Sequence, residues 1–101
     1  MEAGRLDRVT VQLTGKRTHV LTWADRDALV RRLSLLRGGS ALLDAFLAAG
    51  ASRPVELDEA ERLALLGAIG LWEHQSALGR AVPRPPAGVI ELRRALLADL
   101  A

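Results

Sequence analysis

The fold is decided by residues 59–78, which read EAERLALLGAIGLWEHQSAL. At about 100° per residue, the spacing of an α-helix, the apolar side chains of this segment separate into two stripes on different sides. One stripe consists of Leu63, Leu66, Gly67, Gly70, Leu71, His74, Ala77 and Leu78, and the other of Leu65, Ala68, Ile69 and Trp72. A helix that is apolar on two sides has to be covered on two sides.

Two arrangements would cover both stripes. The earlier elements of the chain cover one stripe, and the other is covered either by the last helix or by the same helix of a second copy, in a homodimer. A tryptophan on the second stripe is either core or an interface anchor. The residues predicted to form the interface are Leu65, Ile69 and Trp72, with Arg93 and Leu35 at its margin. Gly67 and Gly70 are expected to permit a close backbone approach on the first stripe, since glycine is otherwise unfavourable in a helix.

Upstream of this helix, residues 8–23 predict a β-hairpin. Val9, Val11 and Leu13 alternate with polar residues, and a second alternating run, rich in β-branched residues, follows a turn near residues 14–17. An isolated two-stranded hairpin is marginally stable in water, so its apolar face must pack on helices. A partner's strand could also extend its edge.

Helical periodicity, caps and breakers predict the remaining elements. Thr22 or Asp25 caps the first helix, and Asp58 caps the long one with Glu61 at the third helical position, as in a capping box. The predicted helices span residues 24–37, 41–49, 59–78 and 89–100, with an extended connector at 51–57. The fold class is therefore α+β, an N-terminal β-hairpin followed by a compact four-helix array. We expect a single domain over residues 1–101, divided into the hairpin (8–23), a helical core (24–78), a proline- and glycine-rich linker (79–88) and a C-terminal helix (89–101).

The last helix carries Arg93 inside its apolar face. Arginine is rarely buried unless it is paired. The favoured interpretation is that its stem covers apolar surface while the guanidinium reaches water. The alternative is an ion pair with a carboxylate of the acidic middle of the chain, such as Glu73, or of a partner chain.

Composition excludes several classes of protein. The chain has 101 residues, half of them hydrophobic, with a net charge of +2, which is unlike a disordered chain. Its longest uncharged run, residues 63–72, is ten residues long, against about 20 for a membrane span. There is no signal-peptide pattern, so we expect a cytoplasmic protein without membrane contact. The absence of cysteine excludes disulfides and thiolate metal sites.

The sequence contains no recognisable catalytic, metal or cofactor motif. The two histidines, His19 and His74, lie 55 positions apart, and no carboxylate cluster has ligand spacing. We therefore expect a non-enzymatic protein without cofactors. The predicted function is a small protein–protein interaction module, an adaptor, regulator or immunity-like partner, that associates with itself.

The alternative prediction is a DNA-binding regulator that contacts phosphates. Its residues would be Lys16 and Arg17 at the hairpin tip and Arg31 and Arg32 on the first helix. The glycine turn between the first two helices is superficially similar to a helix-turn-helix. The second helix, however, has no basic residue with which to read the major groove.

Overall fold

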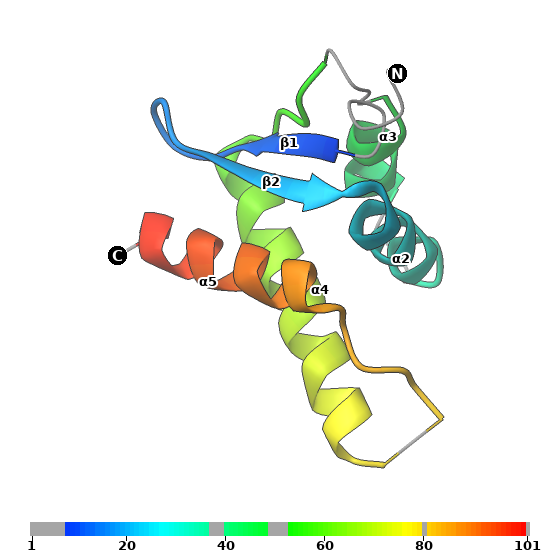
Figure 1. Ribbon diagram of the computed structural model, residues 1–101. Helices are drawn as coiled ribbons and strands as arrows, with labels where there is room; N and C mark the ends of the chain where they lie inside the picture. Colours follow the sequence, from blue (N-terminus) through cyan, green and yellow to red (C-terminus); the bar gives the residue numbers. More distant parts are fainter. Residues whose placement is uncertain (1–7, 37–39, 49–52, 80, 101) are drawn as a thin grey trace.

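The computed structural model describes residues 8–36, 40–48, 53–79 and 81–100. Its elements are β1 (Arg8–Gln12), β2 (Thr18–Thr22), α2 (Trp23–Ser34), α3 (Ser40–Ala48), α4 (Glu59–Ala77) and α5 (Ala87–Leu100) (Figure 1). A two-stranded hairpin followed by four helices is the predicted α+β architecture. No helix among these residues is long and apolar enough to cross a bilayer.

The two strands form an antiparallel hairpin with Val9 opposite Leu21 and Val11 opposite His19. The predicted turn is confirmed: the Leu13 N–H donates to the Arg17 carbonyl at 2.9 Å. Gly15 has a φ of +68°, in the left-handed region that glycine adopts without steric cost.

The connector before α4 is extended, as predicted, and it also pairs with β1. The Val55 N–H donates to the Thr10 carbonyl at 2.7 Å, and the Val55 carbonyl accepts from the Gln12 N–H at 2.9 Å. The chain thus covers the second edge of β1 with its own backbone, at the site where the sequence left room for a partner's strand.

Capping boxes begin two of the helices. Thr22 Oγ1 accepts from the Asp25 N–H at 3.1 Å at the start of α2, and Asp58 Oδ1 accepts from the Glu61 N–H at 2.7 Å at the start of α4. Both predicted caps are confirmed. Helix α2 ends at Ser34, three residues before its predicted end. Gly38, Gly39 and Gly50, which follow the first two predicted helices in the sequence, lie outside the described residues.

Helix α5 begins at Ala87, two residues inside the predicted linker. Its second residue, Gly88, lies against the start of α2, where an added Cβ would overlap the Asp25 carboxylate. The glycine is therefore explained by close packing between the two helices, and not by an irregular linker.

The core lies where α5 meets the hairpin on one side and α4 on the other (Figure 1). Its largest fully buried side chains include Phe46, Leu21, Leu29, Leu33, Leu65, Ile69, Leu92 and Leu96. Leu97 and Leu100 of α5 lie outside the core and remain exposed.

The end of α5 is attached to the hairpin turn through Asp99. Its carboxylate accepts hydrogen bonds from the Thr14 N–H at 2.9 Å and the Thr14 hydroxyl at 2.5 Å. The hydroxyl hydrogen bond is the main cause that lowers the pKa of Asp99. Burial opposes it, and the Thr14 N–H, Arg62 and Arg17 add to the lowering.

Candidate interaction surface

The stripe of α4 that contains Trp72 lies in the core of the chain itself. Leu65 and Ile69 are fully buried and Trp72 is 3% exposed, with α5 packed against α4. The Trp72 indole Nε1–H donates to the Pro83 carbonyl at 2.7 Å, which holds the linker over the ring. These three predicted interface residues thus have no surface to offer a second chain in this arrangement. A docking surface on α4 has to be sought on its other side.

The opposite stripe of α4 is exposed to solvent. Leu63 is 48% exposed, Leu71 45% and Leu78 57%. We define the open face of α4 as Ala60, Leu63, Ala64, Gly67, Leu71 and His74, with Leu78 just beyond the helix; Glu59 and Ala77, which are also exposed, lie at its edge. This row carries no carboxylate, lysine or arginine.

The glycines of this helix do not serve a close approach within the chain. A Cβ on Gly67 would meet no atom within 4 Å. One on Gly70 would lie 3.5 Å from Arg93 Nε, an ordinary van der Waals distance. The expected close approach is therefore absent from the described part of the single chain.

Arg93 forms an ion pair with Glu73, as in the alternative interpretation of the sequence. The Arg93 Nε lies 3.6 Å from Glu73 Oε1, and each side chain is 35% exposed. The pair joins α5 to α4 at the border of the core. Because its partner is in the same chain, Arg93 does not mark an interface by itself.

Leu35 and Trp72 meet at a shallow pocket of about 180 Å³ between α2 and the linker. Leu35 is 74% exposed, whereas Trp72 presents only a small edge. The pocket is lined by Ala28, Arg31, Arg32, Leu35, Trp72 and Pro83. The predicted interface residues are thus divided between the core, this pocket and the Arg93–Glu73 pair.

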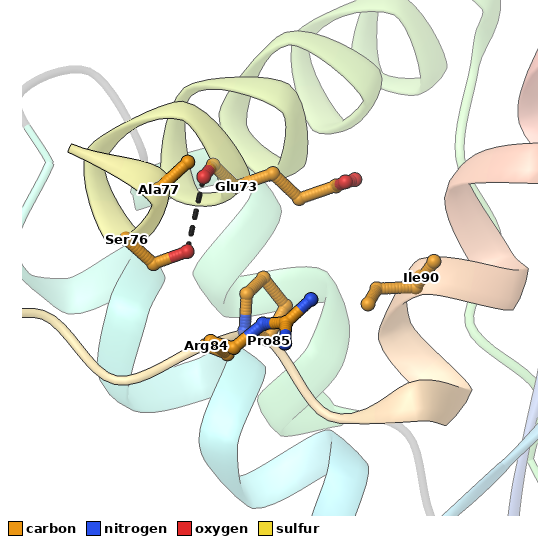
Figure 2. A pocket seen from close by; sticks show the side chains of 6 residues that line it. All are labelled: Glu73, Ser76, Ala77, Arg84, Pro85 and Ile90. Carbon is orange, nitrogen blue, oxygen red and sulfur yellow. Dashed lines mark hydrogen bonds between the residues drawn. The ribbon is translucent and has the colours of Figure 1, made fainter. Parts of the chain in front are cut away.

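A second cavity, of about 340 Å³, lies between the C-terminal half of α4 and the start of α5. Its lining consists of Glu73, Ser76, Ala77, Arg84, Pro85 and Ile90 (Figure 2). The Ser76 hydroxyl donates to the Glu73 carbonyl at 3.0 Å, and the Glu73 carboxylate extends toward α5, where it pairs with Arg93 (Figure 2). The hydroxyl of this cavity is therefore engaged by its own helix, and neither histidine lines the cavity.

The four basic residues of the DNA-binding alternative lie in two separate places. Strand β2 runs from the hairpin tip, with Lys16 and Arg17, to the start of α2, which carries Arg31 and Arg32 (Figure 1). Arg17 Nη1 lies 3.9 Å from Asp99, and Arg31 Nη2 lies 3.1 Å from Asp27, four residues earlier in α2. Arg32 donates to the Gln75 side chain and lies 5.9 Å from the centre of the Trp72 ring. The structure does not join these residues into one basic patch.

The two histidines lie on different elements of the fold. His19 lies in β2 opposite Val11, and His74 is exposed on the open face of α4. Among the described residues, no three potential metal ligands gather.

Sequence reasoning missed one buried charge, Arg26. Its side chain lies over the Trp23 ring, 4.3 Å from the centroid, and donates to the Phe46 carbonyl at 3.3 Å. It thereby joins α2 to α3. Its helical spacing to Leu29 and Leu33 was the signal that could have placed it on the buried face.

Comparison of the chain with protein-family models, with curated proteins and with solved structures finds no match.

Proposed function

We propose that this protein is a small, non-enzymatic protein–protein interaction module that associates with itself through the open face of α4. Single exposed leucines are ordinary on a protein surface, whereas a continuous apolar row is typical of an interaction site. The observation that carries the proposal is the row itself, in which three leucines about half exposed follow one helix without an intervening formal charge.

Covering this row would contribute favourably to association. Full burial of a leucine side chain contributes about 1.5–3 kcal/mol, so a leucine that is already half buried has about 1 kcal/mol left to gain. Covering Leu63, Leu71 and Leu78 would therefore contribute about 1 kcal/mol of favourable free energy for each leucine. Glu59 and Glu73 lie outside the row, as expected for an apolar interface centre with a polar rim.

Light scattering over a range of protein concentrations tests this function. We expect a concentration-dependent dimer, and we expect Leu63→Gln with Leu71→Gln to give a monomer with nearly unchanged thermal unfolding. The matched control is Leu97→Gln, which alters a leucine of similar exposure on α5 and should leave the dimer intact. A wild-type chain that stays monomeric at every concentration would overturn the proposal.

We propose that a module of this kind acts as an adaptor, a regulator or an immunity-like partner. In each of these roles the self-associated form presents its remaining surface to another protein. The pocket beside Leu35 is the candidate for that second contact, because it combines apolar walls with the Arg31 and Arg32 guanidinium groups.

A further inference from the structure

We infer that two copies of this chain pair through their α4 helices in antiparallel orientation, with Gly67 on the twofold axis. This inference rests on the proposed function and specifies the occupant of the open face: a second copy of the same helix.

The first argument is the symmetry of the open face about Gly67. In a twofold interface, residue i contacts residue j of the partner and j contacts i. Leu63 and Leu71 lie four residues before and after Gly67, and Ala60 and His74 lie seven residues before and after it. Antiparallel pairing about Gly67 therefore places Leu63 against Leu71 of the second copy on both sides of the axis.

The second argument is the glycine at the centre. Gly67 lies in the middle of a 19-residue helix, faces solvent and has nothing within 4 Å of an added Cβ. Glycine at such a position costs about 1 kcal/mol relative to alanine. No contact among the described residues offsets that cost. Against a second copy, the missing side chain lets the two backbones approach closely and brings the flanking leucines into contact.

The third argument is electrostatic. Glu59 is exposed at the first turn of α4, at the edge of the open face. Parallel pairing would align the two helix dipoles and would bring the two Glu59 carboxylates near each other, whereas antiparallel pairing opposes the dipoles and separates the carboxylates. Both effects favour the antiparallel orientation.

The size of the contact sets the expected affinity. A helix of 19 residues is about 28 Å long, so one helix pair forms an interface at the small end of the range for specific complexes. We therefore expect a weak dimer whose population rises with protein concentration.

A bulky residue at position 67 distinguishes an effect on dimer formation from an effect on the stability of the folded monomer. Gly67→Gln should raise the dissociation constant about tenfold or more, since the side chain keeps the backbones apart. The same change should leave the urea midpoint of the dilute monomer equal or higher, because glutamine is the better helix former. Ala98→Gln, on an exposed position of α5, should leave the dissociation constant unchanged. A Gly67→Gln chain with the affinity of the wild type would overturn the inference.

Cysteine cross-linking tests the orientation, and the chain contains no cysteine of its own. Under mild oxidation, Gly67→Cys should cross-link to itself. A mixture of Leu63→Cys and Leu71→Cys chains should give the mixed product in large excess over either self-product. Glu91→Cys, exposed on α5, should give none.

The outcomes distinguish this inference from the function on which it rests. Self-products of Leu63→Cys and of Leu71→Cys without the mixed product would indicate parallel pairing and would overturn the inference alone. A dimer in light scattering without any of the expected cross-links would do the same. A monomer in light scattering would overturn the proposed function as well.

Discussion

Leu65 and Leu63 lie two residues apart in α4, and one is fully buried while the other is 48% exposed. The stripe around Leu65 includes Ile69 and the large ring of Trp72, whose indole N–H has a carbonyl partner in the linker. The stripe around Leu63 includes Gly67 and Gly70, which offer α5 no side chain to pack against. The comparison shows that the face covered by α5 is the one that carries the tryptophan ring with its hydrogen-bonded indole N–H.

From this comparison we predict that truncating one leucine on each face of α4 changes the free energy of unfolding by very different amounts. Leu65→Ala should lower the free energy of unfolding by about 2–5 kcal/mol, because it leaves a cavity in the core. Leu63→Ala should change it by less than about 0.5 kcal/mol, as expected for a surface site. Urea denaturation of the dilute protein measures both. Equal losses would show that the two faces are covered alike.

The position of α5 on the buried face depends on Gly88. Gly88→Ala should lower the free energy of unfolding by about 1–2 kcal/mol, since the new methyl group displaces the Asp25 carboxylate from its capping position. In an Asp25→Ala background the same change should have little effect, because the carboxylate it displaces is already absent. A full loss in both backgrounds would place the cost in the α5 backbone and not in the α2 cap.

The other end of α5 should respond to pH through Asp99. Its pKa is lower in the folded chain than in the unfolded chain, chiefly through the Thr14 hydroxyl. The stability it contributes is therefore fully present above the ordinary aspartate pKa and is lost as the pH falls through the lowered value, in the range from about pH 5 downward.

Asp99→Asn should remove this contribution. Urea midpoints of variant and wild type should differ near neutral pH and converge in acid. The control is Glu91→Gln, at an exposed carboxylate that pairs only with Arg94 among the described residues. A constant difference between Asp99→Asn and wild type across the pH range would contradict the assignment.

A small effect is also expected at the border between the two faces of α4. Glu73→Gln should lower the free energy of unfolding by no more than about 1 kcal/mol, because the pair with Arg93 is partly exposed and its atoms are 3.6 Å apart. Thermal unfolding at low and high salt measures this contribution. A loss well above that value would mean that the pair belongs to the α4–α5 core.

Much of the fold follows from local patterns in the sequence. The alternation in residues 8–23 predicts the hairpin, and the capping residues Thr22 and Asp58 predict where α2 and α4 begin. These features depend on neighbours three or four residues away. The pairing of Val55 with β1, the role of Gly88 and the bond from Asp99 to Thr14 join residues up to 85 positions apart. No local pattern contains that information.

The candidate surface likewise depends partly on local sequence patterns and partly on long-range contacts. The amino-acid sequence alone determined that residues 59–78 form one helix with two apolar stripes, because helical periodicity is a local property of the chain. Only the tertiary structure decided which stripe α5 covers and which remains open, because that choice depends on long-range packing of large side chains against α5. The open face of α4 is therefore visible only after the chain has folded.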